Sequence, residues 1–444
     1  MNGQNPRQIA ARVLSLRKPN GEFIEDLLER ALANAQLSPA DRGLCQEIVY
    51  GVVRWQATLD WLIARKTNGR EQKSALQNLL RLGLYQIFWL DRIPDHAAVH
   101  ETVELAKQNS FGPQAGFVNA ILRGYLREAD ETKKLLAELK NSNLAIGFSH
   151  PQWLVEKWQK RFGEQRTRQL LGWNNTPPKT FARVNTLKTD AGKLLDNWRE
   201  ENIEYDFVRR DWLEENLAFE LKSHPPLNSL ASFRDGWFYI QDPSTLLAAC
   251  KLSAQPGETI LDLCAAPGGK TTFIAQLMND EGQIVACDIS EERLKLVQEN
   301  CARLGVTCVE LRRSRGDEAQ SEKSEIGQRF LTSSPTIFDR VFVDAPCSNT
   351  GVMRRRVDLR WRISPEEILR LQKTQLDLLK LAATKLKPGG VLIYSTCSLE
   401  PEENSDVVKE FLRGHENFKL ESGRELLPFV DNVDGAYVAR ILCS

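Results

Sequence analysis

The stretch DLCAAPGGKT, from Asp262 to Thr271, points most directly to the fold class. It follows an apolar run that predicts a strand at 259–263, and it opens a segment whose apolar spacing predicts a helix at 269–278. Its two glycines allow the backbone to turn tightly and to approach a ligand closely. In open α/β folds, ligands bind at such turns, beyond the carboxyl ends of the strands. We therefore expect a ligand-binding loop in an α/β domain.

Strands and helices alternate around this loop, from residue 239 to residue 444. Further strands are predicted at 284–287, 307–311, 338–343 and 391–394, and further helices at 290–304, 364–386 and 402–412. Such alternation is typical of an α/β domain with a mainly parallel sheet. Residues 318–336 are polar and lack periodicity, so we expect a surface insertion there.

Residues 1–130 predict an all-α domain. Ser38 and Pro39 form a helix start signal, apolar residues keep helical spacing through 76–87, and no strand pattern intervenes, which suggests about six helices. Residues 131–145 are polar and charged, which indicates a linker.

Residues 146–238 predict a small α+β module. Its expected elements are helices at 152–162, 165–173 and 190–201 and strands at 180–185 and 205–208. Three domains also suit the length, because 444 residues are too many for one ordinary core.

The composition indicates a soluble protein. No run approaches the roughly 18 apolar residues of a membrane span, and the N-terminus lacks the apolar core of a signal peptide. We therefore expect a cytoplasmic protein without a membrane partner. The net charge is zero, so nucleic-acid binding would need local basic patches. The nine cysteines include no Cys-x-x-Cys, which argues against both a disulfide framework and a metal site, and we expect no metal.

Three kinds of ligand site could use the glycine-rich turn. A P-loop would need Gly-x-x-x-x-Gly-Lys-Ser/Thr; Gly269-Lys270-Thr271 fits its end, but Cys264 stands at the first glycine position. A dinucleotide site would need Gly-x-Gly-x-x-Gly, which is absent. An S-adenosylmethionine site gains support from Asp288, which ends the second strand and can accept hydrogen bonds from ribose hydroxyls.

Asp317 extends this third interpretation. It follows Gly316 beyond the third predicted strand, where it could meet the adenine edge. Asp288 alone could be an ordinary acid at a strand end, so the S-adenosylmethionine interpretation depends on its combination with the glycine loop.

Two cysteines end neighbouring strands of the predicted sheet, in Asp344-Ala-Pro-Cys347-Ser and Tyr394-Ser-Thr-Cys397-Ser. A lone cysteine is usually a small core residue, but two at equivalent strand ends indicate shared chemistry. A thiolate that adds to C6 of cytosine makes C5 nucleophilic toward a methyl sulfonium, and a second thiol can serve product release. Asp344 could neutralise charge that develops near N3 of the base. The spacing alone does not say which cysteine attacks.

These motifs, together with Pro401-Glu-Glu-Asn404, resemble those of the RNA 5-methylcytosine methyltransferase family. The stretches Arg7–Arg12 and Gly116–Arg123 resemble the RNA-binding fold of NusB, which a bacterial branch acting on small-subunit (16S) ribosomal RNA carries in front of its catalytic domain. The resemblance covers nearly the whole chain. It implies a NusB-like all-α domain, a small α+β module and a class I, Rossmann-like methyltransferase domain. It also implies S-adenosylmethionine as cofactor and ribosomal RNA as partner, and we expect a monomer.

The family's site residues can be placed on this sequence one by one. By resemblance, Cys397 is the nucleophile, Cys347 assists product release and Asp344 contacts the target base. The implied S-adenosylmethionine site comprises Cys264, Ala265, Ala266, Pro267, Gly268, Gly269, Lys270, Asp288, Asp317 and Asp344. The target cytidine must leave any helix to reach these groups, so we expect a flipped or looped base.

The chain departs from the family pattern near the cysteines. Asn349 stands where a small residue is usual, Phe342 where leucine is usual, and Val357 where proline is usual. Asp434-Gly-Ala-Tyr437 replaces a usual Asp-Gly-Phe-Phe run. None of these changes removes a catalytic group, but they leave the shape of the base pocket open.

Basic residues near the Cys347 motif could hold the RNA. They are Arg354, Arg355, Arg356, Arg360 and Arg362, with Trp361 among them. Cationic side chains suit a phosphate backbone, and an aromatic ring can stack on an unpaired base. The alternative is a solvated loop with Trp361 in the core. A second basic group, with an equally good case for a solvated face, comprises Arg7, Arg12, Arg17 and Lys18.

Two other functions stay open at this point. The same chemistry could act on transfer RNA. The chain could also be an RNA-binding assembly or antitermination factor whose methyltransferase domain is inactive. The complete motif set favours an active enzyme.

Overall fold

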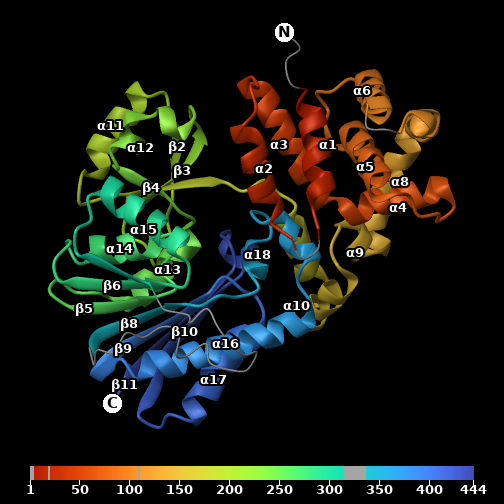
Figure 1. The fold of residues 1–444 in the computed structure, drawn as a ribbon. Coiled ribbons are helices and arrows are strands. Elements are labelled where there is room, and N and C mark those ends of the chain that lie inside the picture. Colours follow the sequence, from red (N-terminus) through yellow and green to blue (C-terminus); the bar gives the residue numbers. More distant parts are fainter. Residues whose placement is uncertain (1–4, 19–20, 109–110, 314–336) are drawn as a thin grey trace. The chain divides into compact units, whose positions relative to one another are not determined.

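The computed structural model describes residues 5–18, 21–108, 111–313 and 337–444, and Figure 1 shows its helices and strands. The chain forms two compact units. Unit 1 comprises Met1–Pro177 and Met353–Arg362, and unit 2 comprises Pro178–Val352 and Ile363–Ser444. The expected site residue Asp317 and the expected insertion at 318–336 lie outside the described residues.

Unit 1 is helical throughout its described part, which confirms the predicted all-α domain. Its elements are α1 (Pro6–Leu16), α2 (Ile24–Ala33), α3 (Pro39–Arg54), α4 (Gln56–Thr67), α5 (Ser74–Trp89), α6 (Asp95–Gln108), η1 (Gly112–Gln114), α7 (Ala115–Arg127), α8 (Ala129–Ser142), α9 (Leu144–Gly147), α10 (Gln152–Asn174) and η5 (Val357–Trp361). Ser38 caps α3 by accepting a hydrogen bond from the Asp41 backbone, and Pro39 occupies the first turn, as its sequence indicates.

The expected linker at 131–145 is wrong, because this stretch forms most of α8 and the first half of α9. Its many charged residues lie on the exposed side of an amphipathic helix, whereas Leu139 is buried and Leu136 packs against the core. The two helical stretches predicted around residue 163 are confirmed within α10, where Gly163 interrupts the helix with a φ of 78°.

The segment Met353–Arg362, termed the clasp, belongs to unit 1 although its chain neighbours on both sides belong to unit 2. Its Asp358 is completely buried. The Asp358 carboxylate accepts hydrogen bonds from Arg17 Nε at 2.5 Å and from the Ile24 backbone at 3.2 Å. A charge-assisted pair inside unit 1 thus anchors the clasp.

Arg360 is the second anchor of the clasp, and it too is completely buried. Its guanidinium donates to the carbonyl oxygens of Arg54 (3.3 Å), Ser149 (3.1 Å) and Asn174 (3.0 Å) and to Asn175 Oδ1 (2.8 Å). Arg54 and Asn174 are the last residues of α3 and α10, so the cation lies at the negative ends of two helices.

The expected RNA-binding role of this arginine cluster is therefore wrong for its buried members. Arg354 is 2% exposed and lies over the Trp173 ring, and Arg362 pairs with Asp358 at 2.6 Å. The alternative reading of Trp361 as a core residue is confirmed, because it packs against the core of unit 1 and its Nε1 donates to a backbone carbonyl. The guanidinium groups of Arg360 and Arg362 bind carbonyl oxygens and the Asp358 carboxylate inside the protein, so these groups are not available to RNA phosphates.

Unit 2 contains a small antiparallel sheet in the order β2-β3-β1-β4, which confirms the predicted α+β module. Its elements are β1 (Thr180–Val184), α11 (Ala191–Glu200), β2 (Glu204–Phe207), β3 (Ala218–Ser223), η2 (Leu227–Ser229), α12 (Ala231–Arg234) and β4 (Phe238–Ile240). Trp198 of α11 is completely buried and packs edge-on against Phe219 and Phe238 of this sheet.

The larger sheet of unit 2 has the order β10-β11-β9-β8-β5-β6-β7. Its strands are β5 (Thr259–Leu263), β6 (Gln283–Asp288), β7 (Val309–Arg313), β8 (Phe338–Asp344), β9 (Leu386–Thr396), β10 (Phe418–Leu426) and β11 (Ala436–Cys443). Strands β5 to β9 pair in parallel, and β10 and β11 add antiparallel pairs at one edge. The predicted mainly parallel α/β domain is confirmed.

Helices cover both faces of this sheet (Figure 1). One face carries α13 (Pro243–Leu252), α14 (Gly269–Leu277) and α15 (Glu291–Leu304); the other carries α16 (Pro365–Ala383) and α17 (Ser405–Arg413). Shorter elements are η4 (Thr350–Val352), η6 (Pro401–Glu403) and α18 (Pro428–Asp431). The strand order reverses between β5 and β8, and such a switch point is where open α/β sheets bind ligands.

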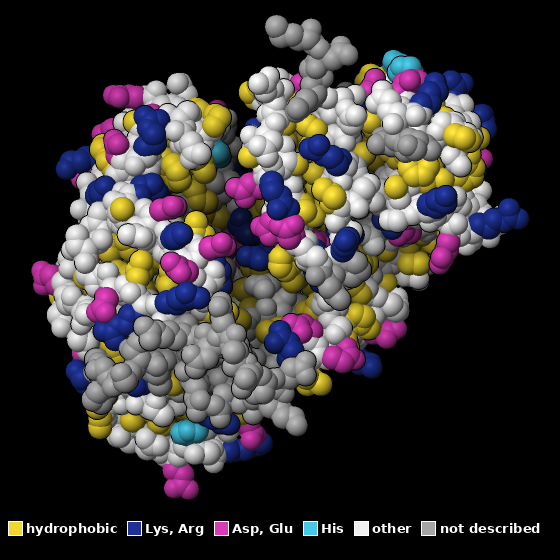
Figure 2. Space-filling model, in the orientation of Figure 1, with side chains coloured by type: hydrophobic (Ala, Val, Ile, Leu, Met, Phe, Trp, Pro, Cys, Tyr) yellow, Lys and Arg dark blue, Asp and Glu magenta, His cyan; other side chains and the backbone are white. Residues whose placement is uncertain are grey.

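Acidic and basic side chains are interspersed on the face drawn in Figure 2, and neither sign forms one dominant patch there. In the part of the chain that the structure describes, no helix is both long and apolar enough to cross a membrane.

Candidate active site

The glycine-rich loop connects β5 to α14 at the switch point. Gly268 turns the backbone with a φ of 98°, and α14 begins at Gly269. A Cβ atom at Gly269 would lie 2.8 Å from Cε1 of Tyr239, and one at Gly268 would lie 3.1 Å from Val297 Cα. These glycines are therefore required by the turn and by close packing within unit 2.

Asp262 lies at the base of this loop. Its Oδ2 accepts a hydrogen bond from Thr271 Oγ1 at 2.6 Å, whereas its buried Oδ1 has no hydrogen-bond partner among the described residues. Burial raises the pKa of Asp262 to about 7. A buried carboxylate oxygen without a donor favours a ligand that brings a positive charge or a donor.

Asp288 ends β6 and is 1% exposed. Its carboxylate accepts backbone hydrogen bonds from Ala266 at 3.3 Å and Ser290 at 3.1 Å, so it is fixed against the glycine-rich loop. Burial, with the nearby carboxylates of Asp288 and Asp344, raises the pKa of Cys264 well above its usual value. Cys264 therefore stays a thiol within the loop.

Lys270 and Asp344 form an ion pair, with Nζ and Oδ2 2.6 Å apart. Ser395 Oγ donates to the other oxygen of Asp344 at 2.9 Å. Burial disfavours the charged form of Lys270, but the charges of Asp344 and Cys397 outweigh it and raise the pKa of the lysine. A permanent positive charge is thus placed near the Cys397 thiol.

The two cysteines that end neighbouring strands come together. Cys347 follows β8 and Cys397 follows β9, and their Sγ atoms are 3.4 Å apart. Both side chains are partly exposed. The hydrogen bond with Cys397 and burial raise the pKa of Cys347 well above its usual value, and the charges of Cys397 and Glu403 add to the rise. Cys347 is therefore held as a thiol.

Asn349, one of the departures from the family pattern, contacts both cysteines. Its backbone has a φ of 56°, a left-handed conformation that asparagine tolerates better than most residues. Its Nδ2 donates to the Cys347 carbonyl oxygen at 2.8 Å, and Cys397 Sγ donates to its Oδ1 at 2.7 Å.

Sequence reasoning missed Glu403, which binds the residues after both cysteines. Glu403 is completely buried and accepts hydrogen bonds from the side chains of Ser348 and Ser398. Two signals were present: each cysteine is followed by serine, and Glu403 lies in the Pro401–Asn404 motif.

The structure brings the Cys264–Lys270 loop, Asp344, Cys347 and Cys397 to one edge of the sheet, with Asp288 at the end of the next strand. Among the described residues, no group of three or more His, Cys, Asp and Glu side chains is arranged to hold a metal ion.

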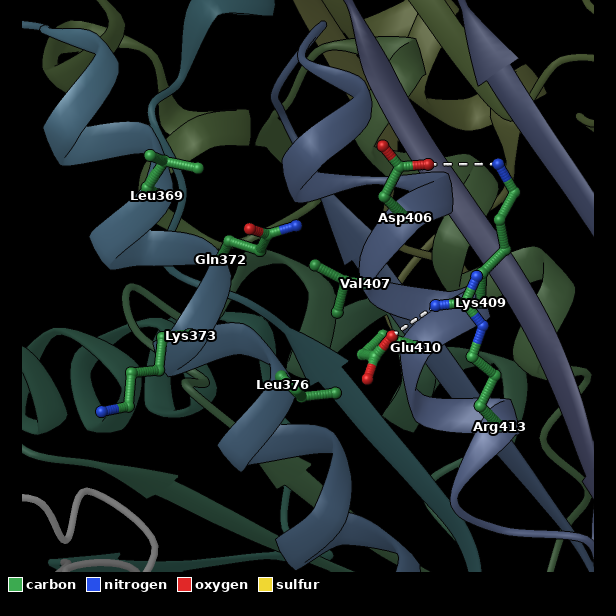
Figure 3. Close-up of a pocket in the computed structure, with 9 residues that line it drawn as sticks. All are labelled: Leu369, Gln372, Lys373, Leu376, Asp406, Val407, Lys409, Glu410 and Arg413. Carbon is green, nitrogen blue, oxygen red and sulfur yellow. Dashed lines mark hydrogen bonds and ion pairs between the residues drawn. The ribbon is translucent and has the colours of Figure 1, made fainter.

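A groove between α16 and α17 is separate from these residues (Figure 3). Its volume is about 460 Å³, and it is lined by Leu369, Gln372, Lys373, Leu376, Asp406, Val407, Lys409, Glu410 and Arg413. Two of its cations pair with acids on their own helix, Lys409 with Asp406 at 3.1 Å and Arg413 with Glu410 at 2.7 Å. Its lining contains none of the thiols.

Known families match three parts of the chain. Residues 249–441 match the 16S rRNA methyltransferase RsmB/F family, residues 4–127 match the NusB family, and residues 150–218 match the ferredoxin-like domain of RsmF/B-like methyltransferases. These matches confirm the predicted NusB-like, α+β and Rossmann-like methyltransferase parts.

Individual proteins match along nearly the whole chain. A probable ribosomal RNA small subunit methyltransferase B of Synechocystis is 37% identical over 94% of this chain and 90% of its own. The ribosomal RNA small subunit methyltransferase B of Escherichia coli is 34% identical over 99% of both chains. A crystal structure of a methyltransferase homologue from Pyrococcus horikoshii is 30% identical, covers 68% of this chain and 97% of its own, and has a TM-score of 0.57.

Proposed function

Because the chain belongs to the RsmB/F family of 16S rRNA methyltransferases, we propose that it transfers a methyl group from S-adenosylmethionine to C5 of a cytidine in small-subunit ribosomal RNA. The observation that carries the proposal is the pair of thiols, 3.4 Å apart, beside the Lys270–Asp344 ion pair. Methylation of an oxygen or nitrogen needs no thiol pair, whereas C5 needs a covalent nucleophile and a group for release. With this substrate, the protein would act in the cytoplasm.

The acids around the glycine-rich loop suit S-adenosylmethionine, which carries a sulfonium and an ammonium group. Asp262 Oδ1 is buried without a partner among the described residues, and Asp288 lies fixed at the end of β6. A positive group or donor near Asp262 would offset the free-energy cost of burying its carboxylate. Asp288, which lies 3.5 Å from the Arg293 guanidinium, can accept hydrogen bonds from ribose hydroxyls. Bound there, S-adenosylmethionine supplies an electrophilic methyl group.

Cys397 provides the nucleophile in this proposal. Its thiolate bonds to C6 of the base, and the electron pair of the C5–C6 double bond becomes available at C5 to bond the methyl carbon. Its Sγ donates a hydrogen bond to Asn349 Oδ1 at 2.7 Å, which orients the sulfur before attack. In the proposal, Asp344, which Lys270 and Ser395 hold by hydrogen bonds, contacts the polar edge of the base.

Cys347 serves the second half of the reaction. After methyl transfer, a base must take the C5 proton; its electron pair re-forms the C5–C6 double bond and expels the Cys397 thiolate. The largest cause of the raised pKa of Cys347 is its hydrogen bond with Cys397. Once Cys397 is bonded to C6, that hydrogen bond is lost; Cys347 can then release its own proton to solvent, and the resulting thiolate accepts the C5 proton.

Product analysis tests the proposal. Purified protein is incubated with small-subunit RNA and methyl-labelled S-adenosylmethionine, and the RNA is digested to nucleosides. We expect label in 5-methylcytidine with the natural protein and none with Cys397→Ala. Label in any other nucleoside, or equal labelling by Cys397→Ala, would contradict the proposal. Labelling of transfer RNA in place of small-subunit RNA would identify the alternative substrate.

A further inference from the structure

One buried carboxylate binds the residue that follows each thiol. Glu403, at the end of η6, accepts hydrogen bonds from the Ser348 backbone at 2.8 Å and from the Ser348 hydroxyl. It also accepts a hydrogen bond from the Ser398 hydroxyl at 2.5 Å. Ser348 follows Cys347 and Ser398 follows Cys397. Hydrogen bonds to a charged acceptor are about twice as strong as neutral ones, so the carboxylate ties the two loops firmly together.

The surroundings of Glu403 fix it in turn. Gln375 Nε2 of α16 donates to its carboxylate at 3.1 Å, and the Tyr394 hydroxyl donates to its backbone carbonyl at 2.5 Å. The neighbouring Asn404 donates from Nδ2 to the Ser398 carbonyl oxygen at 2.9 Å. A fully buried carboxylate would be costly without such donors, and here each oxygen has two.

We propose that Glu403 is a positioning residue, which sets the separation of the Cys347 and Cys397 thiols by binding the serine after each cysteine. Its carboxylate accepts hydrogen bonds from these loops and from Gln375. It therefore acts through the loops and not on the reacting atoms. The catalytic meaning rests on the proposed function, whereas the positioning is a property of the protein alone.

The charge of Glu403 adds a second consequence. It contributes to the raised pKa of Cys347, after Cys397 and burial. The titratable groups that face Cys347 are Cys397, Glu403 and Tyr394. Replacing the carboxylate of Glu403 by an amide should therefore extend alkylation of Cys347 by iodoacetamide to lower pH.

The rate of disulfide closure measures the thiol separation without any methyl transfer. Diamide takes the two thiol hydrogens and leaves a Cys347–Cys397 disulfide, which peptide mapping by mass spectrometry detects. We expect Glu403→Gln and the double variant Ser348→Ala/Ser398→Ala each to slow closure by roughly 10-fold, because catalytic geometry is sensitive to shifts of about 1 Å. Ser405→Ala and Glu410→Gln, which lie on α17, serve as matched controls and should close at the natural rate.

Disulfide closure tests the positioning role of Glu403, and methyl transfer tests the proposed function. Slower closure in both test variants, with unchanged controls, supports the proposal; closure at the natural rate in both overturns it. If Glu403→Gln fails to fold, the double serine variant decides, since it keeps the carboxylate. Methyl transfer is measured in parallel, and kcat should fall roughly 10-fold while KM for S-adenosylmethionine changes less than about twofold. Absence of methyl transfer by the natural protein would contradict the proposed function and leave the closure result standing.

Discussion

Cys347 and Cys397 share a local sequence, a cysteine followed by serine at the end of a strand, yet they meet different surroundings. Cys397 donates to Asn349 Oδ1 and lies near the Lys270 charge. Cys347 is held as a thiol by its neighbour Cys397 and by burial. Family resemblance gives the proposed order of these thiols from the sequence, and the structure adds that their hydrogen-bond partners differ.

Asp344 carries the first prediction at the scale of a residue. Asp344→Asn keeps the size of the side chain but removes the charge that pairs with Lys270. We expect kcat for methyl transfer to fall at least about 10²-fold, because the polar edge of the base loses a charged partner. Ser395→Ala removes one neutral hydrogen bond to the same carboxylate and should cost about 10-fold at most. Single-turnover assays at saturating S-adenosylmethionine check this; equal rates for Asp344→Asn and the natural protein would rule out the proposed base contact.

At the scale of the element, the clasp shows why charge alone misleads. Its arginines look like an RNA-binding patch in the sequence because the groups that neutralise them lie far away along the chain. Arg17, the end of α3 and the end of α10 supply these partners only after folding. A basic segment can therefore stabilise the interior of a fold when its cations bind the carboxyl ends of helices and a buried acid.

Arg360→Met tests this structural role. The variant keeps most of the apolar stem but leaves the carbonyl oxygens of Arg54, Ser149 and Asn174 without their donor. We expect the free energy of unfolding of unit 1 to fall by about 2–4 kcal/mol. Arg356→Ala, at an exposed position of the same segment, should change it by less than about 0.5 kcal/mol. Urea titrations followed by circular dichroism decide, and equal effects of the two variants would refute the anchoring role.

His150, beside this anchor, makes the stability of unit 1 depend on pH. Its Nδ1 lies 2.7 Å from the Phe148 carbonyl oxygen and so donates, whereas its Nε2 accepts from Asn174 Nδ2 at 3.3 Å, which requires a neutral ring. Burial and the charge of Arg360 lower the pKa of His150 well below its usual value. Below pH about 6.5 the unfolded chain binds a proton that the folded chain refuses, so stability falls as the pH drops.

The expected slope is at most about 1.4 kcal/mol per pH unit. Free energies of unfolding between pH 7.5 and 5.5 should fall more steeply for the natural protein than for His150→Gln. Other groups titrate in both proteins, so the difference between the two slopes isolates His150. Parallel curves would show that His150 accepts its proton in the folded state.

At the scale of the whole molecule, the small sheet of unit 2 supports the glycine-rich loop of the larger one. Arg183 of β1 is completely buried and donates to the Gly269 carbonyl oxygen at 2.8 Å and to Gln241 Oε1 at 2.7 Å. Its guanidinium also lies 4.9 Å from the ring centre of Phe273 in α14. A residue almost ninety positions away thus fixes the start of α14, and local sequence does not show this.

Arg183→Met should weaken cofactor binding. Loss of the guanidinium removes the hydrogen bond that holds the first turn of α14. We expect the Kd for S-adenosylmethionine to rise about 10-fold, because this factor corresponds to the free energy of roughly one charge-assisted hydrogen bond. Arg199→Ala, an exposed position on α11, is the control. Isothermal titration calorimetry gives both constants. An unchanged Kd together with a lower melting temperature would limit Arg183 to general stability.

Local sequence patterns predicted most of the helices and strands. The features that they did not predict depend mainly on contacts between residues far apart in the sequence. The strand at 259–263 and the separate helical stretches at 152–162 and 165–173 follow from apolar spacing, and they are found as predicted. The apolar run of β11 was overlooked, and β10 is largely polar with an irregular register between Leu420 and Ser422, so neither strand was anticipated. The roles of Glu403 and the clasp depend on contacts between distant segments, which periodicity cannot show.

The most direct test of the central claim is to identify which sulfur bonds to the RNA. Cys347→Ala is incubated with small-subunit RNA and S-adenosylmethionine, the mixture is digested with protease and nuclease, and the crosslinked peptide is sequenced by mass spectrometry. Because this variant attacks but cannot complete release, we expect an accumulated adduct in which Cys397 is bonded to a methylated cytosine. An adduct through another residue, or accumulation in Cys397→Ala in place of Cys347→Ala, would contradict the assignment of the two thiols.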